Sequence, residues 1–386
     1  MNVRLAVWGG LGAAAVFLAI GAAWLFFLPA PPVAVALAPI PAIEAESMLA
    51  ALQPPKRKRP LIAIIAINEA TETTDYLMPY GILKRADVAD VLALATGPGP
   101  VALYPALKVE AEATTAQFDV RHPEGADYVI VPAMSRDDDP QALQWIRAQA
   151  AKGAVIVSVC VGAKVAAAAG LLDGKSATTH WYFIDDLLDE HPGIHYVRNR
   201  RMVVDQGVAS TTGVTASMPM MLTLIEAIAG RDKAVAVARD LGVGHWDARH
   251  DSNAFTFNRS FALTAIRNRL AFWNREELGI PLSPGIDEVS LALAADAWSR
   301  TYLSSALTYA SAAGPLESRH GMRLIPDRIA ADWPAQRRIS EIGRMKPAEA
   351  LDQTLARIAS RYGDGTADFV AMQIEYPGRR AAEPVP

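Results

Sequence analysis

The sequence contains a single cysteine, Cys160, among its 386 residues. One cysteine excludes an intramolecular disulfide framework, and no C-x-x-C pair or zinc-type cluster of histidine and cysteine is present. His245 and His250 are five positions apart, a spacing that suits metal binding on neither a helix nor a strand. No metal or other cofactor is therefore expected, and the thiol is either an inert core residue or a reactive one.

The chain also lacks a basic excess. Its formal net charge is −4, and no basic recognition helix or helix-turn-helix pattern follows Gly242. Nucleic-acid-binding proteins normally carry a clustered positive surface. No nucleic-acid partner is expected.

Charge is absent from residues 5–28, a run of twenty-four residues that is long enough to cross a hydrocarbon core. This run predicts a transmembrane helix; a cleaved signal peptide is the alternative, although its apolar region would be shorter. Arg4 favours a cytoplasmic N-terminus, which places the body on the periplasmic or extracytoplasmic side.

Residues 29–60, rich in proline and alanine, predict a spacer with a short helix around 44–52. Its basic run, residues 56–59, is interpreted as a lipid contact or a solvated hinge.

Residues 61–245 have the pattern of one α/β domain. Apolar runs of strand length alternate with amphipathic stretches of helix length, which predicts a mostly parallel sheet flanked by helices. Buried strands are expected at 61–67, 88–95, 127–132 and 154–159, helices at 74–85 and 140–151, and a hairpin over 196–204.

The last third changes character. Residues 246–284 predict a helical linker, and 285–386 an α/β extension. A faint internal repeat appears when Gly99 is matched to Gly314, with a helix-like stretch at 302–309 opposite residues 76–83. The extension is then either a degenerate, shortened copy or an unrelated addition.

Cys160 follows the apolar strand 154–159 and precedes Gly162 and a run of small helix formers. A sharp strand-to-helix turn exposes a side chain and directs helix N–H groups toward it, which suits a nucleophile. The alternative is a buried structural cysteine. His180 follows the next turn, and Asp75 begins the helix after the first strand, so both can reach the same sheet edge as Cys160. The Val161 and Gly162 N–H groups are the expected oxyanion donors.

These residues resemble the ThiJ/PfpI family, which has the flavodoxin-like, class I glutamine-amidotransferase-like fold. The resemblance is carried by the stretches 75–81, 127–132, 158–181 and 203–217, and it is nearest to the branch with isonitrile hydratases and the sensor domains of AraC-type regulators. It implies that Cys160 is the reactive cysteine, His180 the histidine that follows it, and Asp75 the acidic residue that hydrogen-bonds the thiol.

Three features depart from the pattern that the resemblance implies. Ala133 and Met134 stand where the family usually has a Gly-Gly pair, and Val161 stands where isonitrile hydratase-like members have a threonine. No pattern of the DNA-binding domain expected after an AraC-type sensor domain follows Gly242. The resemblance predicts a cysteine-dependent hydrolase or lyase acting on a small carbonyl, amide or nitrile-like substrate. The alternative is a non-catalytic metabolite or redox sensor that uses the same pocket. Expected partners are a small molecule, the membrane through residues 5–28, and a second copy in a homodimer.

Overall fold

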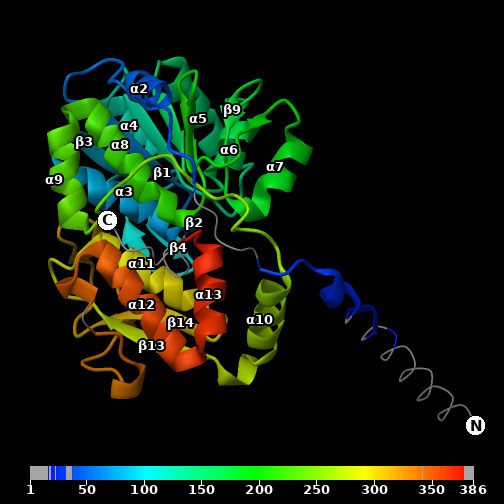
Figure 1. Ribbon diagram of the computed structural model, residues 1–386. Coiled ribbons are helices and arrows are strands. Elements are labelled where there is room, and N and C mark those ends of the chain that lie inside the picture. The colour runs from blue at the N-terminus through cyan, green and yellow to red at the C-terminus, as the bar shows by residue number, and fades with distance from the viewer. Residues whose placement is uncertain (1–15, 17–18, 22, 32–36, 341, 378–386) are drawn as a thin grey trace, which may run out of the picture.

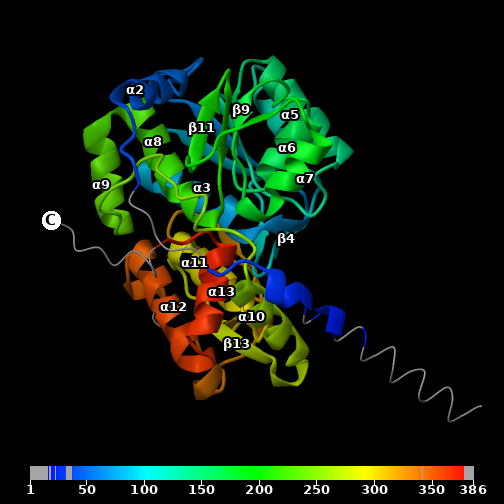
Figure 2. The same cartoon turned by 45° about the vertical axis from the view of Figure 1, so that its right-hand side comes forward.

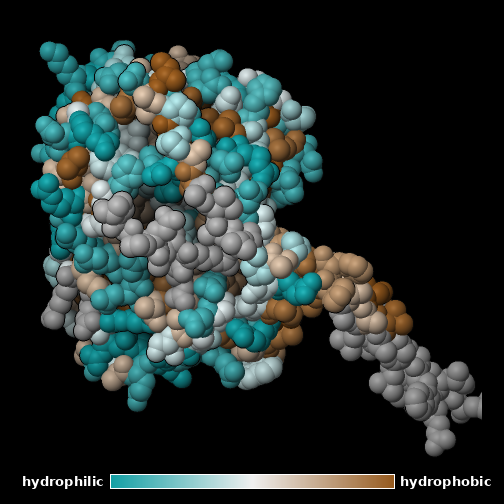
Figure 3. Space-filling model, viewed as in Figure 1, coloured by the Kyte–Doolittle hydropathy of each residue, from teal (hydrophilic) through white to brown (hydrophobic). Residues whose placement is uncertain are grey.

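The computed structural model describes residues 16, 19–21, 23–31, 37–340 and 342–377. The predicted membrane span, residues 5–28, lies largely outside these residues. Among the helices of the described part, none has the length and apolar character needed to cross a membrane. The described end of this segment contacts the body, because Arg259 donates a backbone hydrogen bond to Pro29 and a side-chain bond to the Leu25 carbonyl. Figure 3 shows apolar side chains gathered on this arm, whereas the body surface is mostly polar.

The spacer contains the expected short helix, α2 (Ala42–Ala51). Its basic run, residues 56–59, is largely solvent-exposed, but three of its four side chains contact the domain that follows. Arg57 pairs with the buried Asp127 at 2.6 Å, and Lys56 donates to the Ala126 carbonyl at 2.7 Å. Arg59 pairs with Asp87 and with Asp90. The run therefore fastens the spacer to the domain that follows.

The first domain is built on a seven-stranded sheet with the order β11-β12-β8-β7-β1-β3-β6. All neighbours are parallel except β11 and β12. Its strands are β1 (Leu61–Ala66), β3 (Asp90–Ala95), β6 (Ala113–Thr114), β7 (Tyr128–Val131), β8 (Val155–Ser158), β11 (Met202–Asp205) and β12 (Val208–Thr211). This arrangement confirms the mixed α/β, flavodoxin-like fold expected from the sequence.

Helices cover both faces of this sheet (Figure 1). Alternate residues of β1 point to opposite cores: Ile62 and Ile64 join one apolar cluster, and Ala63 and Ile65 join the other. The first face is covered by α3 (Thr73–Ala86), α8 (Ser217–Ala229) and α9 (Arg231–Leu241), and the second by α4 (Thr115–Arg121), α5 (Pro140–Ala151) and α6 (Gly162–Ala168). Strands buried on both faces need continuous apolar sequence, which explains the run at 61–67.

The hairpin predicted over 196–204 is wrong. β10 (His195–Tyr196) pairs with β9 (Ser176–Ala177), and the antiparallel hairpin is formed by β11 and β12 instead. The turn of that hairpin is at Gln206 and Gly207, both of which have positive φ. Glycine is favoured at the second position of a two-residue hairpin turn with positive φ, so Gly207 was a signal for this hairpin in the sequence.

The C-terminal unit follows α10 (Arg259–Leu270). It contains the parallel strands β13 (Glu276–Pro281), β14 (Ser304–Ala310) and β17 (Arg328–Ile329), the short strands β15 (Leu316–Glu317) and β16 (Arg323–Leu324), and the helices α11 (Glu288–Ser299), α12 (Pro347–Tyr362) and α13 (Asp364–Gln373). The stretch 302–309 is predicted as helix-like, but from residue 304 onward it forms strand β14, whose first residues alternate between buried and exposed. Since β13 lies within the predicted linker 246–284 and pairs with β14, the unit begins before residue 285.

The two parts pack closely together (Figure 2). Helix α11 lies against α3, and Gly81 makes this approach possible, because a Cβ there would lie 2.5 Å from the Glu288 carboxylate. A second sheet crosses the junction in the order β15-β16-β5-β4-β2, where β2 is Glu69–Glu72, β4 Pro100–Tyr104 and β5 Lys108–Glu110. The C-terminal unit is thus continuous with the first domain's core.

Candidate functional site

Cys160 lies on the turn between β8 and α6, as the sequence predicts. Its φ is +57°, a left-handed conformation that is uncommon for a residue with a side chain. Its N–H donates to Thr211 Oγ1 at 3.1 Å, and its carbonyl accepts from Thr179 Oγ1 at 3.0 Å. These two hydroxyls hold the strained turn in place.

Gly162 makes the turn possible. A Cβ at this position would lie 2.0 Å from the Val131 carbonyl oxygen, so that no side chain fits where α6 starts beside the end of β7. The Gly162 N–H donates to the Val159 carbonyl at 2.8 Å, which occupies one of the two expected oxyanion donors. Val161 precedes the first residue of α6 and is only partly buried.

Asp75 lies in the first turn of α3 and is fully buried. Its Oδ2 accepts the Ala133 N–H at 3.1 Å, while Oδ1 has no hydrogen-bond partner among the described residues. Burial, followed by the charge of Glu72, raises the pKa of Asp75 well above its ordinary value. Burial therefore favours the protonated form of the Asp75 carboxyl, which can donate a hydrogen bond.

Glu72 is a site residue that the sequence reasoning missed. It caps α3, since its Oε2 accepts the Asp75 N–H at 2.6 Å and the Thr74 hydroxyl at 2.8 Å. Burial and the nearby Asp296 raise the pKa of Glu72 to about 7, against the opposing effect of Arg300. An acidic residue at the start of a predicted helix is a known capping signal, and it could have pointed to Glu72.

Arg300 was also missed, and it comes from the C-terminal unit. It follows the last residue of α11 and pairs with Glu72 Oε1 at 2.8 Å and with Asp296 at 2.7 Å. Burial lowers the pKa of Arg300, but the charges of Asp296 and Glu72 outweigh that effect and raise it. No local motif identifies this arginine, because its partner Glu72 lies in another part of the chain.

His180 is close to the same sheet edge, but both of its ring nitrogens are engaged. Nε2 lies 2.8 Å from the Gln373 carbonyl oxygen, and Nδ1 accepts the Tyr182 N–H at 3.2 Å. The proton therefore resides on Nε2, since a carbonyl can only accept. Burial lowers the pKa of His180 to about 4. In this conformation the ring has no nitrogen available to accept a proton from the thiol.

The end of α13 and the two residues after it contact the turn at residues 180–181 and the loop at Thr215. Trp181 donates from its indole to the Met372 carbonyl at 2.8 Å and from its backbone to Glu375 Oε1 at 2.6 Å. Thr215 bonds both to Ile374 and to Glu375. Gly213 lies between the Glu375 and His180 side chains, since a Cβ there would lie 2.9 Å from each. Residues 372–375 are consequently held against the cysteine domain by hydrogen bonds.

Cys160 itself is 4% exposed. Burial raises the pKa of the thiol well above its ordinary value, and the charges of Asp75, Glu72 and Glu375 act in the same direction, while Arg300 opposes them. The closed site thus holds a neutral thiol next to several carboxyls. Thiol chemistry needs the thiolate, so the closed arrangement suppresses it.

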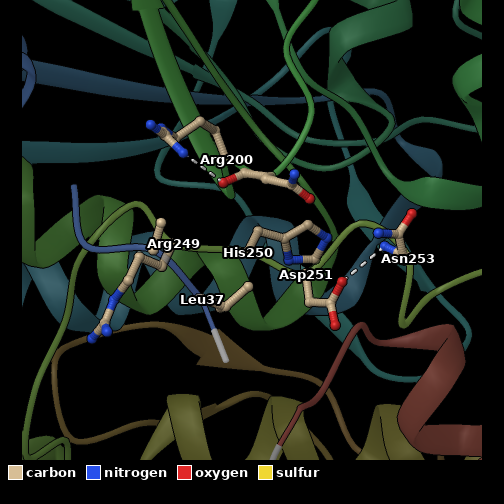
Figure 4. Close-up of a pocket in the computed structure, with 8 residues that line it drawn as sticks. Leu37, Arg200, Arg249, His250, Asp251 and Asn253 are labelled. Carbon is tan, nitrogen blue, oxygen red and sulfur yellow. Dashed lines mark hydrogen bonds between the residues drawn. The ribbon is translucent and has the colours of Figure 1, made fainter. Parts of the chain in front are cut away.

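A separate cavity of about 210 Å³ lies next to this site (Figure 4). It is lined by the spacer residues Leu37 and Ala38 and by the polar residues Asn199, Arg200, Arg249, His250, Asp251 and Asn253. His250 also reaches toward the closing segment, because its Nε2 lies 3.4 Å from Glu375 Oε2. The described residues contain no cluster of histidine, cysteine and acidic side chains that could hold a metal ion.

The strand, strained cysteine turn and short helix are now placed within a parallel sheet, with an acidic residue from the first helix beside them. Residues 62–227 match the DJ-1/PfpI family. The match confirms the ThiJ/PfpI resemblance for this part of the chain. It includes Asp75, Cys160 and His180, and it ends before the C-terminal unit.

Three curated relatives are similar to part of this chain. Isonitrile hydratase of Pseudomonas putida is 41% identical over 104 residues, which cover 27% of this chain and 44% of that protein. The HTH-type transcriptional regulator CdhR of Pseudomonas aeruginosa is 34% identical over 112 residues, 29% of this chain and 33% of that protein. The Parkinson disease protein 7 homolog of Danio rerio is 23% identical over 186 residues, 46% of this chain and 95% of that protein. The first two matches therefore span less than half of each relative.

Proposed function

We propose that this chain is a cysteine-based sensor of a small electrophilic metabolite or oxidant, in which the C-terminal segment keeps Cys160 closed and protonated until the ligand arrives. The observation that carries the proposal is the burial of the site: the thiol is 4% exposed, and both ring nitrogens of His180 are occupied. An enzyme in its resting state normally presents its nucleophile to an open cleft.

The same contacts would transmit a change at Cys160 to the C-terminal unit. His180 and Trp181 bind the carbonyls of Gln373 and Met372, so any change at Cys160 that moves the 180–181 turn also moves the end of α13. The polar cavity next to His250 is a candidate entrance, because His250 lines the cavity and also faces Glu375. The ligand class is the one that a thiol attacks, namely carbonyl, nitrile-like or activated amide carbon.

A cysteine-dependent hydrolase or lyase is the second candidate. The left-handed φ of Cys160 favours it, because strain at a strand-to-helix turn is typical of positioned nucleophiles. The relation to isonitrile hydratase points to nitrile-like carbon as one substrate class. In this case the segment 372–375 would act as a lid that opens during turnover.

Alkylation of the single cysteine distinguishes an open from a closed site. We expect intact-mass measurements at pH 7 to show that iodoacetamide labels the native chain at least tenfold more slowly than the chain in urea. Glu375→Ala removes the acceptor for the Trp181 N–H and should accelerate native labelling, whereas Glu349→Ala, at an exposed position of α12, is the matched control. Equal labelling of native and unfolded wild type would contradict the closed site.

The number of product molecules formed per chain distinguishes a sensor from an enzyme. Wild type and Cys160→Ala would be incubated with a panel of small isonitriles, amides and aldehydes, with product followed over many equivalents. The sensor predicts at most one equivalent of adduct per chain, together with a change in the Trp181 environment. Product beyond one equivalent that disappears in Cys160→Ala would establish the enzyme instead.

A further inference from the structure

The C-terminal unit repeats the element order of the first part of the cysteine domain. Strand, helix, strand, hairpin and a short final strand follow one another in both segments. The corresponding elements are β1 and β13, α3 and α11, β3 and β14, β4 and β15, β5 and β16, and β6 and β17. Only β2 has no counterpart among the described strands.

The correspondence extends to single residues, many of which lie 215 positions apart. Helix α3 begins at Thr73 and α11 at Glu288, and their acidic caps are Glu72 and Asp287. The two central strands differ by one residue in register, because Leu61 pairs with Asp90 but Glu276 pairs with Ser304. The pairing of the short final strand keeps the 215-position offset. The partners are Leu94 with Ala113 and Ala95 with Thr114 in the first segment, and Tyr309 with Arg328 and Ala310 with Ile329 in the second. Unrelated extensions have no reason to preserve both cap position and the register of the final strand.

The two segments face each other across a local two-fold axis. In the junction sheet, hairpin β4-β5 and hairpin β15-β16 are joined through β5 and β16, which are antiparallel. Arg323 pairs with Glu110 and Leu324 with Val109, so each strand presents equivalent positions to the other. Helices α3 and α11 lie against each other beside this sheet (Figure 1). Self-complementary contact of this kind is the pattern of a two-fold dimer interface, here formed within one chain.

Two ion pairs across the junction are equivalent under the same two-fold relationship. Arg85, near the end of α3, reaches the cap Asp287 of α11, and Arg300, at the end of α11, reaches the cap Glu72 of α3. The two arginines are again 215 positions apart. Both arginine side chains are largely buried.

The two ion pairs differ in the part of the chain that lies next to them. The first segment continues into β7, β8 and Cys160, whereas the second continues into α12 and α13. Only the Arg300 contact therefore faces a cysteine. The charged and titratable groups around Glu72 are Asp75 from α3 and, from the region of α11, Asp296 and Arg300. Besides burial, the charges of Asp75, Glu72 and Glu375 raise the pKa of the Cys160 thiol, and Arg300 lowers it.

We propose that residues 276–329 are a degenerate second copy of residues 61–114, packed in the place of a partner subunit, and that this copy supplies Arg300 as a positioning residue for the Cys160 site. Arg300 acts through Glu72: it holds the carboxylate at the cap of α3, next to Asp75. The role assigned to the site rests on the proposed function, because it takes Cys160 as the reactive centre.

The test uses Cys160 as a spectroscopic reporter in the full chain. With ¹³Cβ-labelled cysteine the chain gives one resonance, whose chemical shift is followed against pH. Because the pKa of Glu375 is also raised to about 7 and its charge acts on the thiol, all chains in this experiment carry Glu375→Gln. In this background we expect an inflection near pH 7 that reports Glu72 and that is absent when Glu72→Gln is added. Arg300→Gln should move it upward by about one pH unit, since one unit corresponds to the loss of one modest charge interaction. Arg300→Lys should restore most of the shift.

Arg85→Gln is the matched control, because it breaks the equivalent contact on the side that has no cysteine. We expect it to lower the thermal midpoint about as much as Arg300→Gln but to leave the inflection within 0.2 pH units, on the order of measurement error. Equal shifts in the two variants, or no shift in Arg300→Gln, would overturn the proposal. This readout does not depend on accessibility of the thiol, so its failure is distinguishable from failure of the closed sensor, which the alkylation experiment tests.

Discussion

The Nε2 atom of His180 lies 2.8 Å from the carbonyl oxygen of Gln373. One residue belongs to the cysteine domain and the other to the last helix of the C-terminal unit, so this contact joins the site to the segment that closes it. Because the other ring nitrogen accepts the Tyr182 N–H, the histidine is held neutral in one tautomer.

This contact predicts that His180 destabilises the folded chain in acid. Its folded pKa of about 4 lies below the ordinary 6.5, so the unfolded chain takes up a proton between these values and the folded chain does not. The stability that His180 contributes is complete above pH 6.5 and is lost as the pH falls toward 4. We expect the free-energy advantage of wild type over His180→Gln to fall by about 2 kcal/mol between pH 7 and pH 5. Urea unfolding measures it, with the exposed His195→Gln as control; a constant advantage would contradict the prediction.

Glu375 should have the opposite pH dependence. Burial raises its pKa from 4.5 to about 7, so the folded chain retains a proton that the unfolded chain releases above pH 4.5. The contribution to stability is therefore greatest in acid and declines as the pH rises toward 7. We expect the difference in unfolding free energy between wild type and Glu375→Gln to move against wild type by about 2 kcal/mol from pH 5 to pH 7. Glutamine keeps the acceptor for Trp181, which isolates the charge; a difference that grows with pH would refute the assignment.

Replacing Gly162 with alanine should strongly lower the free energy of unfolding. In Gly162→Ala the new methyl group would lie 2.0 Å from the Val131 carbonyl oxygen, so the turn at Cys160 must move. We expect a loss of about 3 kcal/mol or more in urea unfolding. Gly244→Ala is the matched control, since its added Cβ meets no heavy atom within 4 Å. Equal stability of the two variants would show that the turn can relax.

Much of the cysteine domain was predictable because its signals are local. The strand at 61–66, the helix at 140–151 and the turn at Cys160 follow from apolar runs, a helix cap and a glycine, all read within a few residues. The strand at 304–310 was misjudged as helical, because a short apolar stretch without its tertiary partners has no decisive period.

The candidate site was predictable only where its residues belong to one domain. Asp75 and Cys160 lie at one sheet edge, near enough for Asp75 to raise the pKa of the thiol, because parallel strands end there. Arg300 and Gln373 could not be found in this way, since their contacts with Glu72 and His180 depend on how the C-terminal unit packs. The match of Gly99 to Gly314 did have the 215-position offset of the two segments, but its pairing of residues 302–309 with 76–83 did not.

Membrane association through residues 5–28 stays a prediction from the sequence. Val16 and Ile20 are 58% and 60% exposed on the described part of this arm, and Arg259 fastens its end to the body. An aspartate at the centre of a membrane span costs roughly 2.5–3.5 kcal/mol, so the double variant Val16→Asp, Ile20→Asp should fail to float with phosphatidylcholine–phosphatidylglycerol vesicles that carry the wild type. Val120→Asp, at an 84% exposed position on the body, should float as the wild type does. If wild type stays at the bottom of the gradient, or if all three chains float alike, residues 5–28 do not hold this protein on a membrane.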